Sequence, residues 1–376
     1  MFSNFSEVMR LLATILVLSA VSVSLTGLVV LADKFINNYG EVEIDVNDGK
    51  KKFKVKGGSS LLSSLAEGKI FVPSACGGKG SCGLCKVKVL SDVGPILPTE
   101  APYLSKDEVA QNVRLSCQVK VKKAIKVWLP EHLFQINEYR AKVEKIVDLT
   151  YDIKEITLKL IDPPTIEFKA GQYIQLIIPP YGDVKEPIMR AYSMSSQPSV
   201  KDRIELIIRK VPGGLATTYI HEHLKVGEEL KFIGPFGEFY LRESNSKIIA
   251  IAGGSGMAPI RSIILDMYEK KIERETYFFF GARSKRDLFY VDFFKNLEKL
   301  YPSFHFIPAL SEPKPEDNWE GEVGLIPQVV ERYLDRFSPD QVEAYLCGSP
   351  GMINASIEVL KKFGLKEEKI FYDKFA

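Results

Sequence analysis

The longest apolar run of the chain lies at its N-terminus. From Leu11 to Ala32 there are 22 consecutive residues without a charge, bounded by Arg10 and Asp33. At 1.5 Å per residue, a helix of this length extends about 33 Å, which is enough to cross the hydrocarbon core of a bilayer. We therefore expect residues 1–35 to form a permanent transmembrane anchor. A cleaved signal peptide is the alternative, but its apolar region would be shorter, and no small-residue cleavage site stands out.

The charges that flank this run predict its orientation. Six lysines follow the span and only Arg10 precedes it; the lysines are Lys34, Lys50, Lys51, Lys52, Lys54 and Lys56. Basic residues collect on the cytoplasmic side of membrane spans. We expect the bulk of the protein to be cytoplasmic and the N-terminus to face outward.

Beyond the anchor, apolar and polar residues alternate in a way that predicts a small β-rich domain over residues 36–132. Glu41 to Val55 alternates around Asn47-Asp48-Gly49, which is a hairpin signal. Residues 60–66 read as a short helix. Lys86–Leu90 and Gln118–Val121 read as strands.

Two further domains follow, with different patterns. Residues 133–243 contain strand-like runs at 141–147, 156–160, 173–178 and 203–210, separated by Pro and Gly, which is typical of an antiparallel barrel. Gly234-Pro235-Phe236-Gly237 reads as a closing turn. Residues 244–376 have α/β rhythm: strands at 247–252, 275–280 and 343–346, with a helix that ends near Lys271.

The charge composition bears on the kind of partner that the protein binds. Lys plus Arg number 50 against 48 Asp plus Glu, and the basic residues are not concentrated in one block. This gives no support to a nucleic-acid partner.

Four of the five cysteines form the strongest chemical signal: Cys76, Cys82 and Cys85 lie in a ten-residue loop with four glycines, and Cys117 follows after 31 intervening residues. Such a loop can wrap closely around a cluster and point N–H groups at its sulfurs. The alternatives are a zinc site, which usually has two short-spaced pairs, a disulfide pair, or buried free cysteines. We interpret the four as ligands of a [2Fe-2S] cluster, and we expect Lys79 beside them to raise its potential.

Four glycine- or hydroxyl-containing segments suggest nucleotide binding. Arg190, Tyr192, Ser193 and Ser196 lie in one extended stretch that could offer guanidinium, ring and hydroxyl groups to a ligand. Gly213-Gly214 opens a short predicted helix that contains Thr217, a geometry suited to phosphate. Gly253-Gly254-x-Gly256 lies between a buried strand and a helix, and differs from the G-x-G-x-x-G fingerprint. Cys347-Gly348 ends a strand, where ligands of open sheets bind.

Together these motifs resemble the ferredoxin-NADP⁺ reductase superfamily with an N-terminal [2Fe-2S] domain. The five-residue gap between Cys76 and Cys82, the N-terminal span and the terminal Asp373-Lys374-Phe375 are similar to the F subunits of sodium-translocating NADH:quinone oxidoreductases. So is Pro315–Trp319. The resemblance implies a multidomain fold, consisting of a transmembrane helix, a β-grasp ferredoxin-like domain, an antiparallel β-barrel FAD domain and an α/β NADH-binding domain.

The resemblance also implies roles for individual residues. FAD would be bound by Arg190, Tyr192, Ser193, Ser196, Gly214 and Thr217, and NADH by Gly253, Gly254, Gly256, Pro259, Cys347 and Gly348. The catalytic residues would be Ser193, Cys347 and Phe375, with Phe375 covering the flavin face where nicotinamide stacks. Cys347 as a small buried hydrophobe and Phe375 as a core plug are the alternatives. The preference for NADH over NADPH comes from the resemblance, since residues 283–286 (Arg-Ser-Lys-Arg) could accommodate a 2′-phosphate.

The activity implied is that of an NADH-oxidising, electron-input subunit in a bacterial (inner) membrane. A hydride would pass from NADH to FAD, and single electrons would pass to the [2Fe-2S] cluster. Integral-membrane subunits of the same complex would then reduce quinone, coupled to sodium translocation. The alternatives are a reductase for a multicomponent oxygenase, which would lack the span at residues 11–32, and a non-enzymatic electron carrier.

Overall fold

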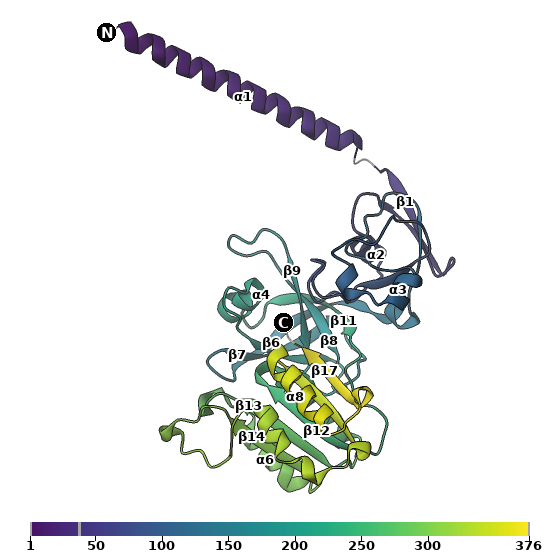
Figure 1. Ribbon diagram of the computed structural model, residues 1–376, viewed down its shortest axis with the longest axis vertical. Helices are drawn as coiled ribbons and strands as arrows, with labels where there is room; N and C mark the ends of the chain where they lie inside the picture. Colours follow the sequence, from purple (N-terminus) through teal and green to yellow (C-terminus); the bar gives the residue numbers. More distant parts are fainter. Residues whose placement is uncertain (1, 37–38, 375–376) are drawn as a thin grey trace. The chain divides into compact units, whose positions relative to one another are not determined.

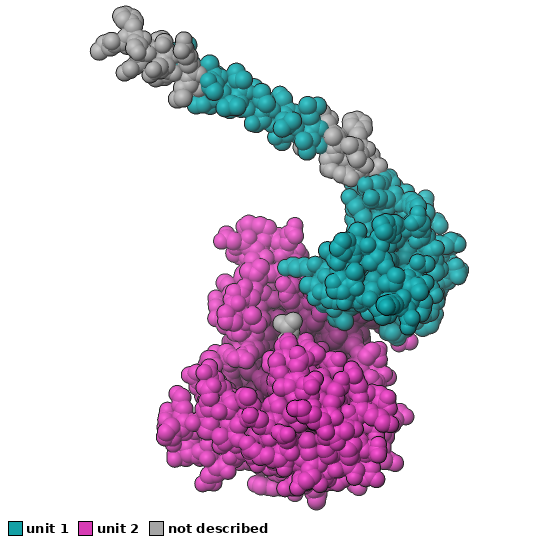
Figure 2. Space-filling model, viewed as in Figure 1, with its two compact units in different colours: residues 1–72, 78–134 teal, residues 73–77, 135–376 magenta. Residues whose placement is uncertain are grey.

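The computed structural model of the chain describes residues 2–36 and 39–374, and within its first helix side chains are described for Met9 and residues 12–29. The chain divides into two compact units, shown in different colours in Figure 2. The first unit comprises residues 1–72 and 78–134. The second comprises residues 73–77 and 135–376. Each unit is described separately below.

The first unit begins with helix α1 (Phe2–Ile36), 35 residues long. Its stretch Leu12–Val29 is, among the described residues, the one helical segment long and apolar enough to cross a membrane, and its side chains are not buried in the protein. The helix that the apolar run predicts is therefore confirmed.

The predicted hairpin is also present. Strands β1 (Glu41–Val46) and β2 (Lys51–Lys56) pair antiparallel. Asn47 and Asp48 take φ values of 51° and 49°, and Asn and Asp are the non-glycine residues that tolerate this left-handed region best.

A five-stranded mixed sheet forms the body of this unit, in the order β2-β1-β5-β3-β4. Its other elements are α2 (Leu61–Glu67), β3 (Lys86–Val89), α3 (Lys106–Ala110), β4 (Val113–Leu115) and β5 (Ile125–Trp128). The short helix begins where the sequence predicts, because the Ser60 side chain caps its first turn by accepting a hydrogen bond from Ser63 N.

The prediction of a strand at Gln118–Val121 is wrong. Gln118 N donates to Leu115 O, so the backbone turns at Cys117 and the strand β4 lies before the cysteine. The segment then makes one isolated bridge between Lys120 and Ser60. Val119 and Val121 are buried, and their backbones bond residues 58–61 instead of a strand of the sheet, which explains why their alternation misleads.

The second unit starts with an antiparallel sheet of six strands, in the order β10-β7-β6-β11-β8-β9. These are β6 (Asn137–Asp148), β7 (Ile153–Asp162), β8 (Tyr173–Ile178), β9 (Ile188–Ser193), β10 (Arg203–Arg209) and β11 (Glu229–Phe236). The sheet closes on itself where Met194, just after β9, bridges Leu206 of β10. The predicted barrel is therefore present (Figure 1).

The predicted turn at Gly234–Gly237 is wrong in its position. Strand β11 continues through Gly234 and Pro235, and Phe236 pairs with Tyr173 of β8. The Phe236 side chain is buried, and its ring stacks on that of Tyr173 at 5.6 Å. The chain turns only at Gly237, where φ is 103°.

The rest of the second unit is a parallel sheet of order β15-β14-β13-β12-β16-β17. Its strands are β12 (Lys247–Gly253), β13 (Thr276–Ala282), β14 (Phe304–Leu310), β15 (Glu322–Val323), β16 (Val342–Gly348) and β17 (Ile370–Lys374). The helices are α5 (Met257–Glu269), α6 (Val291–Leu300), α7 (Ile326–Glu331) and α8 (Pro350–Lys362). The predicted α/β rhythm is confirmed.

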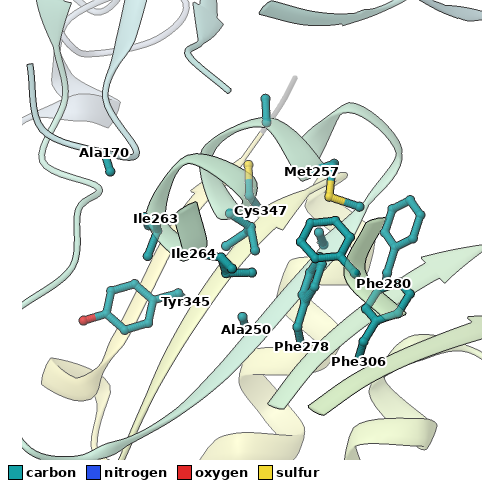
Figure 3. Packing of buried hydrophobic residues seen from close by; sticks show 14 of the residues in the cluster. Ala170, Ala250, Met257, Ile263, Ile264, Phe278, Phe280, Phe306, Tyr345 and Cys347 are labelled. Carbon is teal, nitrogen blue, oxygen red and sulfur yellow. The ribbon is translucent and has the colours of Figure 1, made fainter. Parts of the chain in front are cut away.

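Helices cover both faces of this sheet. On one face, residues of α5 and α6 pack on Phe278, Phe280 and Phe306, and Figure 3 shows this cluster with Cys347 among its members. On the other face, residues of α7 and α8 pack on Ile249, Ile251 and neighbouring strand residues. Parallel sheets covered on both faces bind their ligands at the carboxyl edge of the strands.

Candidate functional site

The first candidate site is the cysteine loop of the first unit. Gly83 has a φ of 68°, and a Cβ on it would lie 2.6 Å from Tyr103 Cδ1, so only glycine fits here. The loop therefore packs tightly against the 3₁₀ helix η1 (Ala101–Tyr103). Such close backbone packing suits a segment that must surround a compact cluster.

The structure brings two of the predicted ligands together. Cys85 Sγ and Cys117 Sγ are 3.2 Å apart, which is much longer than the bond of a disulfide. All five cysteines are in the described part of the chain, and none forms a disulfide. The disulfide alternative is therefore excluded for this structure, and two soft donors face each other as iron ligation requires.

The complete set of four ligands stays a prediction. Cys76 falls in the segment 73–77, which is grouped with the second unit, and the site is described here from the first unit alone. Within residues 2–36 and 39–374, no group of three or more His, Cys, Asp or Glu side chains is gathered as a metal site. The prediction that Cys76 and Cys82 are ligands therefore rests on their spacing in the sequence.

Burial raises the pKa of the Cys85 thiol to about 12, with the neighbouring Cys117 as a further cause. Cysteine binds metal as the thiolate. Metal binding at this residue is therefore accompanied by loss of its proton.

A buried ion pair lies close in sequence to Cys117, the predicted fourth ligand. Arg114 Nη2 lies 2.6 Å from Glu100 Oε2, and Glu100 is fully buried. Glu100 also accepts hydrogen bonds from Leu115 N and Leu97 N. Burial alone would raise the pKa of Glu100, but the Arg114 guanidinium and the two backbone hydrogen bonds outweigh it and hold that pKa below its usual value. Arg114 is three residues before Cys117, so the pair holds the backbone that presents this ligand.

The second candidate site begins on strand β9 of the barrel. Arg190 and Tyr192 share one side of this strand and Ser193 lies on the other, because side chains alternate. Arg190 Nη1 donates to Met189 O, and burial raises the pKa of the Tyr192 hydroxyl. The strand thus offers a cation and a ring on one side, and a hydroxyl on the other.

Three of the predicted FAD residues have structural partners within the protein. Ser196 is buried and its Oγ accepts a hydrogen bond from Glu205 N. Thr217 Oγ1 donates to Gly214 O at 3.1 Å, and a Cβ on Gly214 would lie only 2.7 Å from this oxygen. The helix that follows, α4 (Leu215–Thr218), has only four residues. The roles of Ser196, Gly214 and Thr217 toward FAD remain predictions.

The glycine segment after β12 forms the entrance to helix α5. A Cβ on Gly256 would lie 2.2 Å from Cys347 O, so the backbone at the start of α5 touches the backbone near the end of β16. Gly256 is the N-cap of α5 and has no side chain to cap the first turn, while Pro259 in that turn lacks an N–H. The other N–H groups of the first turn lie at the positive end of the helix dipole, which is the arrangement that binds phosphate.

Three residues from three strands meet at the carboxyl edge of the parallel sheet. Cys347 of β16 pairs with Asp373 of β17, and Ser193 Oγ of the barrel lies 3.5 Å from Asp373 Oδ2. Burial raises the pKa of Cys347, and the Asp373 carboxylate raises it further. Burial also raises the pKa of Asp373, which Ser193 partly offsets. At neutral pH the Cys347 thiol is therefore protonated and is not a nucleophile.

Contacts between the barrel and the parallel-sheet domain fix this arrangement. Arg261 Nη1 of α5 donates to Ser195 O at 2.9 Å and to Glu205 Oε2 at 2.7 Å. Ser262 Oγ donates to Ser196 O at 2.6 Å. Ser193 is thus held opposite Cys347 and Asp373. Phe375, the third predicted catalytic residue, lies outside the described residues.

Sequence reasoning missed two charged residues of this second site. Asp373 belongs to the tail segment that carried the resemblance, but its position beside Cys347 requires the strand register of β16 and β17. Arg209 donates to Asp152 Oδ2 at 2.7 Å, and a Cβ on Gly254 would lie 3.7 Å from Arg209 Nη1. No spacing rule connects Arg209 with that glycine.

The basic run after β13 is occupied by other contacts. Arg283 Nε lies 2.8 Å from Glu312 Oε2, and Lys285 Nζ donates to Asp317 O. The Arg286 guanidinium lies 4.5 Å from the centre of the Tyr151 ring. A 2′-phosphate would have to compete with these contacts.

Three family models match the chain in succession. The 2Fe-2S iron-sulfur cluster binding domain matches residues 44–122, the oxidoreductase FAD-binding domain 140–240 and the oxidoreductase NAD-binding domain 250–357. The chain therefore has domains for a [2Fe-2S] cluster, FAD and NAD.

Curated relatives match over nearly the whole chain. The F subunit of the Na(+)-translocating NADH-quinone reductase of Klebsiella pneumoniae subsp. pneumoniae is 37% identical, covering 98% of this chain and 100% of that protein. The protein of the same name in Idiomarina loihiensis is 38% identical, covering 94% of this chain and 96% of that protein.

Solved structures share the fold. The Amycolatopsis cytochrome P450 reductase GcoB matches with a TM-score of 0.70 and 27% identity, covering 89% of this chain and 98% of its own. The ferredoxin reductase in carbazole 1,9a-dioxygenase matches with a TM-score of 0.68 and 25% identity, covering 90% of this chain and 99% of its own.

Proposed function

The chain belongs to the family of Na(+)-translocating NADH-quinone reductase F subunits, and we propose that it is the NADH-oxidising, electron-input subunit of such a membrane complex. The observation that carries this is the full-length similarity to F subunits, with cluster, flavin and nucleotide domains in the same chain. When bound, FAD takes the two electrons of an NADH hydride and releases them singly to the cluster, which accepts one at a time.

In this proposal, the residues of the second unit bind and orient NADH and FAD. The first turn of α5 and Arg209 would bind the pyrophosphate of NADH, since both offer positive charge beside Gly254. Arg190, Tyr192, Gly214 and Thr217 would bind FAD. Ser193, Cys347 and Asp373 would line the position where nicotinamide approaches the flavin. Hydride transfer needs no strong base, so these groups contribute by orientation.

The helix α1 supports attachment to the membrane. Its stretch Leu12–Val29 is apolar and exposed, and the sequence has six lysines after it against one arginine before it. These observations favour a single-pass anchor in a bacterial inner membrane, with the soluble domains in the cytoplasm. Other integral-membrane subunits of the complex would then receive the electrons that reduce quinone.

We also propose the domain boundaries that the sequence suggests, 1–35, 36–132, 133–243 and 244–376. The family models lie inside the last three ranges. Limited proteolysis of the purified protein, with mass spectrometry of the fragments, tests them, because cleavage should concentrate near residues 36, 133 and 244.

The experiment that tests the function is NADH oxidation by the purified full-length chain in detergent, with ferricyanide as the electron acceptor. We expect turnover that depends on added FAD and is supported by NADH. A chain that binds FAD and the cluster but does not oxidise NADH would be a carrier and would contradict the proposal.

A second function is favoured by the similarity to the two solved reductases. The chain could deliver electrons to an oxygenase component instead of a membrane complex. Fractionation distinguishes the two, because the helix α1 predicts that the protein stays in the membrane fraction at high salt and leaves it only with detergent. Release by salt alone would favour the oxygenase reductase.

A further inference from the structure

We propose that Gln118 raises the reduction potential of the [2Fe-2S] cluster through a hydrogen bond from its side-chain amide to Cys117 Sγ, and that Thr99 holds this amide in place. The inference rests on the proposed function, because it needs the cluster at Cys117. It concerns two residues that the motifs of the sequence did not single out.

The geometry is a chain of two contacts. Gln118 Nε2 lies 3.5 Å from Cys117 Sγ, which is within hydrogen-bond range for the large sulfur atom. Thr99 Oγ1 donates to Gln118 Oε1 at 2.9 Å. Both contacts lie within the first unit.

The chemistry of the two contacts fixes which end of the amide faces the sulfur. A metal-bound thiolate can only accept a hydrogen bond, so it requires the N–H₂ end. The Thr99 hydroxyl can donate, and it satisfies the remaining oxygen. The opposite orientation would place the amide oxygen against the negative sulfur and would be repulsive.

Gly80 makes room for this amide. A Cβ at position 80 would lie 2.6 Å from Gln118 Nε2, and Gly80 has a φ of 75°. Any other residue would be strained there and would push the amide away from the sulfur. A glycine of the cysteine loop is thus matched to a side chain that follows the fourth cysteine.

Both ends of the contact chain are anchored to the same buried ion pair. Thr99 precedes the fully buried Glu100, which bonds Arg114 and Leu115 N. Gln118 follows three residues after Leu115, and its N–H donates to Leu115 O. The backbone segments that carry the Thr99 hydroxyl and the Gln118 amide are therefore held by the same set of hydrogen bonds.

Reduction adds one electron, supplied by the flavin, to the cluster and increases the negative charge on its sulfurs. A hydrogen bond to sulfur is therefore stronger in the reduced than in the oxidised protein, and it raises the potential. Hydrogen bonds to charged groups are about twice as strong as neutral ones. We expect loss of the amide to lower the equilibrium constant for cluster reduction about tenfold. This corresponds to a midpoint potential that is about 59 mV lower for a one-electron couple.

The test is a redox titration of the full-length protein, followed by EPR of the reduced cluster. Gln118→Leu should lower the midpoint potential by the stated amount. Thr99→Val removes the hydrogen bond that holds the amide but leaves the amide present, so it should lower the midpoint by less. Gln111→Leu is the matched control, because Gln111 is exposed after α3 and its backbone N–H bonds Asp107. Its midpoint should equal that of the unmodified protein.

The outcomes separate this inference from the proposed function. If the unmodified protein shows no cluster spectrum, the proposed function fails. If the cluster is present and Gln118→Leu leaves the midpoint unchanged, only the inference is overturned. If Gln118→Leu does not retain a cluster, Thr99→Val decides, and an unchanged midpoint there contradicts the proposal.

Discussion

The two candidate sites of this protein are built in opposite ways. The predicted cluster ligands come from one short glycine-rich segment and one nearby strand end, and Cys85 and Cys117 are 32 residues apart. The edge site of the second unit, at the carboxyl edge of the parallel sheet, brings together Ser193 and Asp373, which are 180 residues apart. The first site is local, and the second exists only once a barrel and a parallel sheet are packed together.

This difference decides what each site depends on. Contacts around the cysteine loop come from one small unit with a buried ion pair, so we expect a change there to affect the cluster alone. The edge site depends on the contacts of Arg261 and Ser262 with the barrel. The following changes should therefore separate the two sites.

The largest effect is expected from removal of a cluster ligand. Cys117→Ala should abolish the absorption and EPR signals of the cluster completely, because one of four thiolates is lost. Reduction of the flavin by NADH, measured by stopped flow, should keep its rate. A parallel loss of flavin reduction would show that the two sites are not independent.

The next effect is expected at the buried ion pair. Arg114→Met leaves Glu100 buried without its main partner, and breaking such a pair costs about 3–5 kcal/mol. Urea unfolding, followed by the cluster absorbance, measures this for the first unit. The exposed Lys122 provides the matched control, and Lys122→Met should change stability by less than about 0.5 kcal/mol.

Low pH should weaken the ion pair between Arg114 and Glu100 and so lower the stability of the first unit. The pKa of Glu100 is lowered in the folded protein from its ordinary value of 4.5. Its stabilising contribution is therefore fully present above that value, and it is lost as the pH falls through the lowered folded-state pKa. The Glu100→Gln variant should show a smaller loss of stability over this pH range. An identical acid profile would contradict the assignment.

A smaller effect is expected at the edge site. Asp373→Asn removes the negative charge beside Cys347 and weakens the contact with Ser193, so nicotinamide should be oriented less well. We expect flavin reduction by NADH to be about tenfold slower, within the range attributed to orientation. The cluster midpoint should not change. Tyr372→Phe, at an exposed neighbouring position, is the control, and a similar slowing there would show that the effect is not specific.

The smallest effect is expected from Lys79. This lysine is exposed, so water and salt screen its charge, whereas Gln118 makes direct contact with sulfur. Lys79→Gly should lower the cluster midpoint, but by less than Gln118→Leu. The shift should also shrink at high salt. An unchanged midpoint at low salt would contradict the expected role of Lys79.

The fold around the cysteine loop could be predicted well from the sequence because its signals are local. The hairpin at Asn47-Asp48, the capped helix after Ser60 and the glycine-rich cysteine loop each depend on residues within a few positions. The prediction failed at Gln118–Val121, because this segment pairs only with the short stretch 58–61 through one isolated bridge and does not join the five-stranded sheet.

The edge site could be predicted only in part. Glycines between strand and helix predict a nucleotide site, since that signal is contained in one βα connection. Asp373 and Arg209 have no local signature, because their places follow from sheet register and from packing between domains. The strand β11 was likewise hidden, since burial of Phe236 carries it through a Gly-Pro pair.

Anaerobic titration of the full-length protein with NADH, followed by optical and EPR spectroscopy, tests the central claim most directly. That claim is that the second unit oxidises NADH and the first unit receives the electrons. We predict that the flavin absorbance falls on addition of NADH and that the EPR signal of a reduced [2Fe-2S] cluster then appears. A flavin that is fully reduced while the cluster stays oxidised would contradict the account.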